Sequence, residues 1–125
     1  MKGVHFIGDW QNCPHPTPEF LEVQALRAAC LKAVEVSGLT ALGDCFHQFE
    51  PYGVTGTVIL EESHLAIHTW PELGGVTLDV YVCNYTEDNT AKAKKLYDYL
   101  FNIFKPKTKH FQMIERGGSD DDPAF

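Results

Sequence analysis

Residues able to act as nucleophiles, acids or bases crowd into one short stretch of this 125-residue chain. Ser63, His64, His68 and Glu72 follow one another closely, and Cys83 ends the strand-like run after them. A hydroxyl or a thiol can attack a carbonyl or deliver a proton, and imidazoles and carboxylates exchange protons near neutral pH. This stretch is therefore the candidate for a reaction site.

Residue types alone leave the chemistry of this stretch open. His64 and His68 have a spacing that chelates a metal on a helix, but in a strand four residues span about 13 Å, too far for a shared zinc. Ser63, His68 and Glu62 have the residue types of a hydrolase triad, yet the G-x-S-x-G elbow is missing from the sequence. A lone cysteine such as Cys83 is more often a small buried hydrophobe than a reactive thiol. We expect no metal, and both catalytic and purely structural roles stay open.

The composition narrows the class of partner. Ten basic residues face seventeen acidic ones, giving a net charge of −7 without a lysine or arginine cluster that would bind phosphates. We therefore expect no nucleic-acid partner. An acidic field favours a cationic small molecule, but such a charge more often serves solubility alone. The chain lacks an apolar run of about 18 residues and a signal-peptide core, so we expect no membrane association and a cytoplasmic location. The four cysteines form no C-x-x-C pair, which favours independent thiols.

Hydrophobic spacing predicts the order strand, helix, several strands, helix, strand. Apolar residues three and four apart indicate a helix over 18–37, with Thr17 as its cap and Ser37-Gly38 as its end. Strict alternation over 76–83 indicates a half-buried strand. A second helix is expected from Asp88 or Asn89 to Pro106. The other predicted strands are a short one beginning at Val4, then 39–50, 54–61, 63–69 and 108–114.

This order predicts the fold class. Two helices on one face of a mostly antiparallel sheet form an α/β (α+β) two-layer sandwich. Residues 1–125 are expected to form one domain, and 117–125, which includes three consecutive aspartates, is expected to be a flexible tail.

Three runs closely resemble the small prokaryotic S-adenosylmethionine decarboxylases. The first is Phe46 to Gly56, FHQFEPYGVTG. The second is Leu60 to Glu72, with its Glu-Ser-His and its Ile-His-Thr-Trp-Pro-Glu, and the third is Asp79 to Cys83. The motifs match in order and spacing, and the resemblance extends over nearly the whole chain, from the first strand to Arg116-Gly117.

The resemblance implies a proenzyme that cuts itself between Glu62 and Ser63. The products would be a β chain of residues 1–62 and an α chain of residues 63–125, with Ser63 converted to a pyruvoyl group that forms a Schiff base with the substrate amine. By the same resemblance His68 is the processing base, Thr55 supports processing where the family usually has serine, and Cys83 protonates carbon after carbon dioxide leaves. The pyruvoyl ketone would replace pyridoxal phosphate, with no metal.

The resemblance also implies a substrate and an assembly. Phe49 and Trp70 correspond to aromatic side chains beside the adenine and the sulfonium, and Glu72 corresponds to the acid that holds the ribose hydroxyls. The product would supply aminopropyl groups for spermidine synthesis. Ser63 and His68 point to opposite faces of an ideal strand, so either a bend near Ser63 or a second subunit must bring them together. The family resolves this with active sites at a homodimer interface.

Three departures from the family pattern touch the substrate side. Gly75 stands where a tyrosine is usual, Asn84 where a glycine follows the cysteine, and Trp10 to Cys13 replaces the common Leu/Phe-Tyr-x-Cys. An alternative is therefore a pyruvoyl-dependent L-ornithine or L-arginine decarboxylase on the same scaffold. A third hypothesis is a non-catalytic α/β module that binds a metabolite and keeps the motif as a relic.

Overall fold

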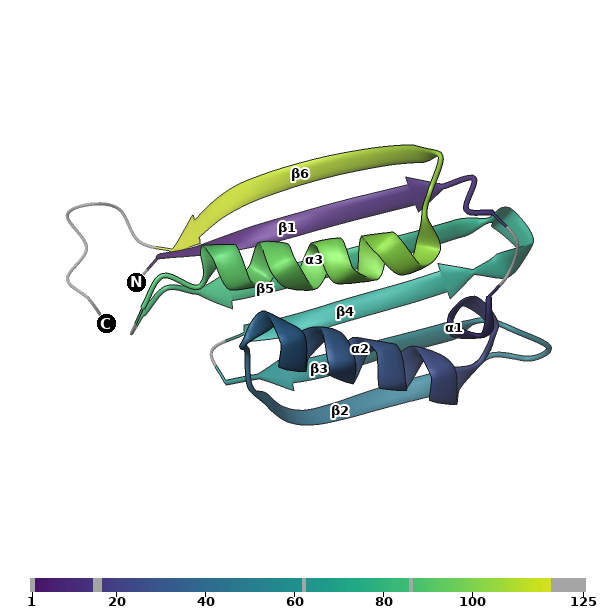
Figure 1. Ribbon diagram of the computed structural model, residues 1–125, viewed down its shortest axis with the longest axis horizontal. Coiled ribbons are helices and arrows are strands. Elements are labelled where there is room, and N and C mark those ends of the chain that lie inside the picture. Colours follow the sequence, from purple (N-terminus) through teal and green to yellow (C-terminus); the bar gives the residue numbers. More distant parts are fainter. Residues whose placement is uncertain (1, 15–16, 62, 86, 118–125) are drawn as a thin grey trace.

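A six-stranded, fully antiparallel sheet forms one layer of the protein (Figure 1). The computed structural model describes residues 2–14, 17–61, 63–85 and 87–117. The strand order is β2-β3-β4-β5-β1-β6, so β4 and β5 lie in the middle and β2 and β6 form the edges. The strands are β1 (Lys2–Gln11), β2 (Ala41–Gln48), β3 (Val54–Leu60), β4 (Ser63–Trp70), β5 (Gly75–Cys83) and β6 (Thr108–Gly117).

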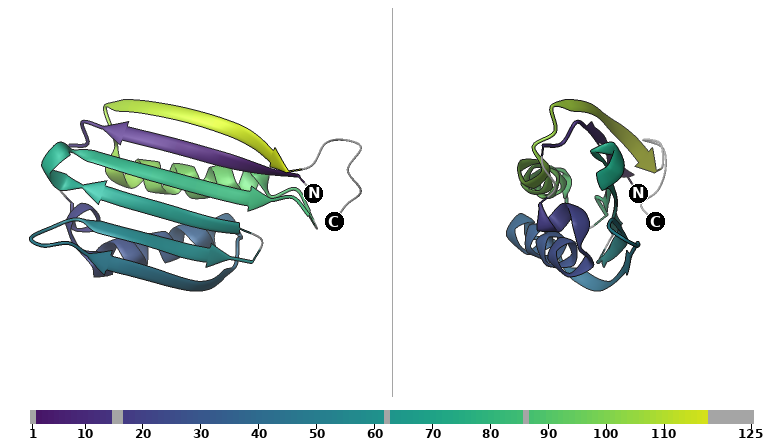
Figure 2. Two further views of the ribbon diagram at one scale, coloured as in Figure 1. Left: turned by 180° about the vertical axis from the view of Figure 1, so that it is seen from behind. Right: turned by 90° about the vertical axis from the view of Figure 1, so that its right-hand side faces the viewer.

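The helices form the second layer, on one face of the sheet. The two long ones are α2 (Val23–Ser37) and α3 (Thr90–Phe104), and a short α1 (Pro18–Leu21) precedes α2. A 3-10 turn, η1 (Pro71–Leu73), joins β4 to β5. Seen from behind, the other face of the sheet has no helix over it (Figure 2). The predicted two-layer α+β sandwich is therefore confirmed.

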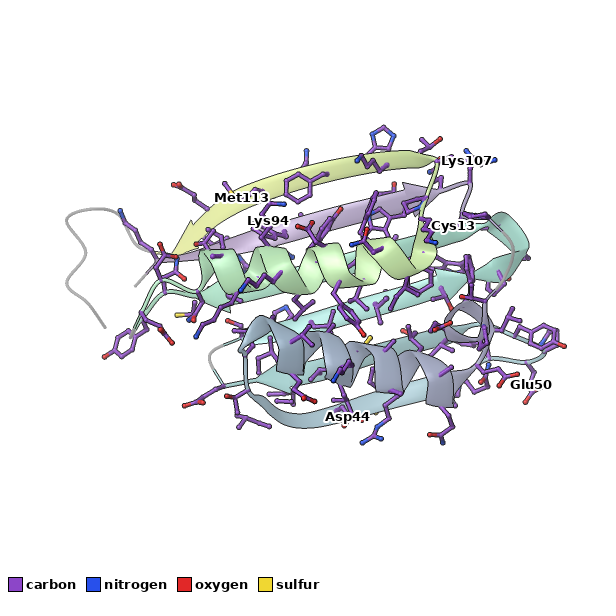
Figure 3. All side chains as sticks on the ribbon, in the orientation of Figure 1. Cys13, Asp44, Glu50, Lys94, Lys107 and Met113 are labelled. Atoms are coloured by element: carbon purple, nitrogen blue, oxygen red, sulfur yellow. The ribbon has the colours of Figure 1, made fainter. Side chains whose placement is uncertain are left out.

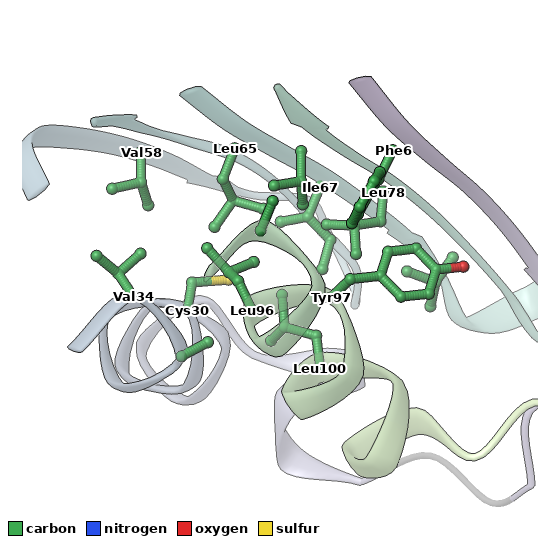
Figure 4. Close-up of a cluster of buried hydrophobic side chains, with 14 of the residues drawn as sticks. Phe6, Cys30, Val34, Val58, Leu65, Ile67, Leu78, Leu96, Tyr97 and Leu100 are labelled. Carbon is green, nitrogen blue, oxygen red and sulfur yellow. The ribbon is translucent and has the colours of Figure 1, made fainter. Parts of the chain in front are cut away.

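Alternating side chains of the strands form the core against the two long helices. Leu65, Ile67 and Leu78 are fully buried on the helix side, and Cys30 and Leu96 face them (Figure 4). Because every second strand residue points to the helices, the same alternation places the intervening polar residues on the uncovered face.

The single helix predicted over 18–37 is wrong at Glu22. This residue is extended (φ −122°, ψ 136°), which separates α1 from α2. The Gln48 side chain accepts a hydrogen bond from Val23 N (2.7 Å) and donates one to Leu21 O (2.8 Å), while Gly53 N also donates to Leu21 O (3.1 Å). These contacts from β2 and the following turn satisfy backbone groups at the break, which local spacing cannot reveal.

Smaller boundaries also differ from expectation. Thr17 occupies the predicted cap position of α1, but its side chain makes no capping hydrogen bond. Gly117, placed at the start of the tail by the sequence, is the last residue of β6. The cleavage partner Glu62 and residues 118–125 lie outside the described part of the chain.

Among the described residues, the helices are too short or too polar to cross a membrane.

A buried hydrogen bond between Trp10 and Tyr97 gives a test of the packing between β1 and α3. Trp10 is wholly buried and its Nε1–H donates to the Tyr97 hydroxyl at 2.9 Å. Tyr97→Phe removes the acceptor, so we expect the free energy of unfolding to fall by ~1–3 kcal/mol. Urea denaturation in a Ser63→Ala background, where the expected cleavage is blocked, measures it. Tyr85→Phe, at an exposed position, should change stability by less than ~0.5 kcal/mol, and equal effects would contradict the assignment.

Candidate active site

The uncovered face of the sheet carries four of the eight predicted site residues. Thr55 on β3, His68 and Trp70 on β4, and Cys83 at the end of β5 all occupy the alternating positions that face away from the helices. The neighbouring positions on β4 and β5 point into the core. The fold therefore spreads polar and aromatic groups over the face of the sheet that the helices leave uncovered.

Thr55 and His68 meet directly across two neighbouring strands. They are register partners in the β3–β4 ladder, and the Thr55 hydroxyl shares a 2.5 Å hydrogen bond with His68 Nδ1. The His68 ring also stacks on Trp70, with ring centres 5.7 Å apart and an interplanar angle of 21°. A hydroxyl coupled to an imidazole fixed on both sides can relay a proton or hold a developing oxyanion.

The three predicted substrate residues line one hollow beside this pair. Phe49, Trp70 and Glu72 border a cavity of about 560 Å³ between the turn after β2 and η1. Phe49 and Trp70 are 47% and 38% exposed, so their rings are available to a ligand. Glu50, in the same turn, lies at the end of the molecule farthest from the two termini (Figure 3).

Two polar side chains that the sequence did not single out hold this hollow in place. Gln48 Nε2 donates to the carbonyls of Phe49 (3.1 Å) and Gly53 (2.9 Å), which fixes the turn that presents Phe49. Thr69, only 3% exposed, accepts from Val54 N and donates to Phe20 O, both at 2.9 Å. In the sequence, both residues are polar side chains at strand positions that face the core. This feature can be recognised only once the register of the strands is known.

Ser63 and Cys83 both lie at the opposite end of the sheet, Ser63 on the helix side, like its register partner Leu60, and Cys83 on the uncovered face. Ser63 is the first residue of β4 and lines a small cavity of about 100 Å³ together with Val82, the residue before Cys83. Glu61, Asn89 and other residues complete that cavity. Cys83 is buried, with 9% of its surface exposed.

One copy of the chain therefore divides the predicted site into two groups. We call Thr55, His68 and the Phe49–Trp70–Glu72 hollow the hollow end, and Ser63 with Cys83 the serine end. β4 pairs with β3 from Ser63 to His68 and with β5 from His64 to Trp70, so the bend near Ser63 that the sequence left open does not interrupt either ladder. Five residues of strand separate Ser63 from His68 by ~16 Å, and the two point to opposite faces.

A polar cluster lies between the two groups on the same face. His5 Nε2 and Asp79 Oδ1 are 3.0 Å apart, and Tyr81 contacts the rings of His5 and His64 and the guanidinium of Arg116. Burial lowers the pKa of His64 below 6.5, and the positive charge of His5 lowers it further. His5 and Asp79 alternate with apolar residues in their strands, but neither they nor Arg116 were predicted as site residues.

Within the part of the chain that the structure describes, the other possible metal ligands and thiols do not form a further functional site. Among the described residues, no three His, Cys, Asp or Glu side chains are grouped so that they could hold a metal ion. The four cysteines are free thiols. Burial raises the pKa of Cys30 to about 12, so this core thiol stays protonated.

Comparisons with known proteins identify the family of the chain. The family model described as S-adenosylmethionine decarboxylase matches residues 4–117. The chain is 37% identical over 124 residues to the S-adenosylmethionine decarboxylase proenzyme of Thermococcus kodakarensis, covering 98% of this chain and 82% of that one. It is 38% identical over 115 residues to the proenzyme of Persephonella marina, covering 92% and 82%.

A solved structure supports the same relationship. The crystal structure of the adenosylmethionine decarboxylase from Aquifex aeolicus superimposes with a TM-score of 0.85 at 34% identity, covering 97% of this chain and 95% of that one. The chain belongs to the S-adenosylmethionine decarboxylase family, whose members are pyruvoyl-dependent.

The lowered pKa of His64 predicts how stability depends on pH. In the unfolded chain His64 binds a proton near pH 6.5, whereas the folded chain binds it only at lower pH. The unfolded state therefore holds more protons as the pH falls through 6.5, and stability falls with it. At one fixed protein concentration, His64→Gln should lose less stability than the wild type between about pH 7.5 and 5.5 in urea titrations. Identical slopes for the two proteins would contradict this assignment.

Proposed function

We propose that the chain is a self-processing, pyruvoyl-dependent decarboxylase of S-adenosylmethionine, which supplies the aminopropyl donor for spermidine synthesis. The observation that carries the proposal is the place of Ser63, the first residue of β4, directly after the turn from β3. The cytoplasm is the proposed location, and neither a metal nor pyridoxal phosphate takes part.

The fold suits a cut before Ser63. Leu60 and Ser63 are register partners across the β3–β4 turn, and Glu61 N donates to Thr40 O at 3.0 Å. β3 is held on its other side by β2, and β4 by β5. Because both flanks stay paired, the two new chain ends would remain beside each other after cleavage.

The proposed roles follow from the side chains. A pyruvoyl group on residue 63 supplies a ketone that accepts electrons from the departing carboxylate. His68, held by Thr55, is the proposed processing base and would act on Ser63 of a second copy of the chain, and Cys83 is the proposed proton donor at the serine end. Phe49 and Trp70 offer ring faces to a sulfonium, an attraction of ~1–2 kcal/mol, and Glu72 offers acceptors to ribose hydroxyls. The hollow that these three share favours S-adenosylmethionine over ornithine or arginine.

A complete site requires two copies of the chain. A two-fold axis between two facing sheets, perpendicular to their strands, brings the serine end of one copy opposite the hollow end of the other. The uncovered face offers exposed apolar side chains for such packing, among them Ile59 and Ile114, which are 53% and 41% exposed. We therefore propose a homodimer with two composite sites.

The first experiment follows cleavage and substrate together. Intact-mass analysis should show fragments 1–62 and 63–125, the second without a free amino terminus, and Ser63→Ala should stay uncut. Carbon dioxide release is then measured from S-adenosylmethionine, L-ornithine and L-arginine in parallel, and only the first should be turned over. An uncut wild-type chain would contradict the proposal. Turnover of L-ornithine or L-arginine without turnover of S-adenosylmethionine would instead support the alternative substrate.

Mixing two defective variants tests the composite site. Cys83→Ala damages the serine end and Glu72→Ala the hollow end, and neither removes a proposed processing residue. Mixed dimers, isolated through two different affinity tags, hold one intact site of two, so about half of the wild-type rate should return. Each variant alone should be strongly impaired. Mixed dimers as inactive as the parents would mean that each site forms within one chain.

A further inference from the structure

We propose that Asn89 is a positioning residue for Cys83. Its buried amide fixes the end of β5 that carries the thiol. This inference rests on the proposed function for the role of Cys83, and it adds a residue that the family motifs quoted above do not include.

Asn89 uses its side chain in an unusual way for its position. It is the N-cap residue of α3, where asparagine normally accepts a hydrogen bond from a backbone N–H of the first helical turn. Here the side chain makes no capping bond, and Nδ2 donates instead to the carbonyl of Cys83 at 2.9 Å. Asn89 is only 5% exposed, so this bond is shielded from water.

Neighbouring side chains make the hydrogen bonds at the start of α3. Asp88 Oδ1 accepts the Thr90 N–H at 2.9 Å. Asn84, which stands where the family usually has glycine, accepts the Asn89 N–H through Oδ1 at 2.8 Å and donates Nδ2 to the Thr90 hydroxyl at 3.3 Å. The start of the helix is therefore stabilised without a capping bond from the Asn89 side chain, whose Nδ2 donates to Cys83 O.

The peptide group after Cys83 is held from both sides. Its carbonyl accepts from Asn89, and its N–H, which belongs to Asn84, donates to Lys2 O on β1 at 2.7 Å. Asn89 also lines the cavity that contains Ser63. The residue therefore links the thiol-bearing end of β5 to the place where the reactive group would form.

The expected consequence is kinetic. A proton donor has to lie within hydrogen-bond reach of the atom that it protonates, and a misplacement of ~1 Å can lower the rate by ~100-fold. Loosening Cys83 should lower kcat, whereas KM depends on the hollow end and should change little.

The experiment compares four variants. Asn89→Ala removes the amide. Asn89→Asp keeps its size and a good N-cap, but at pH 8 its carboxylate cannot donate to Cys83 O. Asp88→Ala weakens the helix start without touching Cys83, and Asn102→Ala removes an exposed amide from the same helix. The readouts are chain cleavage, kcat and KM, and the rate at which iodoacetamide alkylates Cys83 in a Ser63→Ala background, followed by peptide mass.

Both Asn89 variants should cleave normally, keep KM within about twofold, lose ~10–100-fold in kcat and alkylate several-fold faster. The Asp88 and Asn102 variants should match the parent. Wild-type kcat or unchanged alkylation in the Asn89 variants would overturn the assignment, and so would an Asp88→Ala variant that reproduces both effects. The alkylation measurement needs no pyruvoyl group, so it still tests Asn89 if the proposed function fails.

Discussion

The straightness of β4 is the constraint on which the rest of the structure depends. The strand pairs with β3 from Ser63 to His68 and with β5 from His64 to Trp70, and its alternating apolar side chains are packed in the core. A strand held in this way cannot bend without breaking two ladders, so the ~16 Å between Ser63 and His68 is fixed. Under the proposed function, chemistry that needs both residues would draw them from two chains.

The two-layer design makes that arrangement available. Helices α2 and α3 supply a core on one side of the sheet, which leaves the other side free to carry histidines, threonines and an aspartate. A sheet face of half-buried polar groups with some exposed apolar side chains suits packing against a second sheet. The central pair His5–Asp79 would lie within such an interface, between the serine end and the hollow end.

The sequence predicted the elements better than their contacts. The alternation in β5 and the helical spacing in α3 were sufficient to predict these two elements, because each pattern spans the whole element. The break at Glu22 could not be predicted, since the Gln48 side chain that stabilises it lies 25 residues from Val23. The Thr55–His68 contact likewise depends on the β3–β4 register. The family resemblance supplied the expected roles of Ser63 and His68. Only the fold showed that one copy of the chain places these two residues at opposite ends of the sheet.

The most direct test is a crystal structure of the enzyme after S-adenosylmethionine has been trapped on residue 63 by borohydride reduction. The account predicts an adduct that begins at residue 63 of one chain and lies against Phe49, Trp70 and Glu72 of the second chain. An adduct in contact with the same three residues of its own chain would contradict the account. So would a protein that forms no adduct at residue 63.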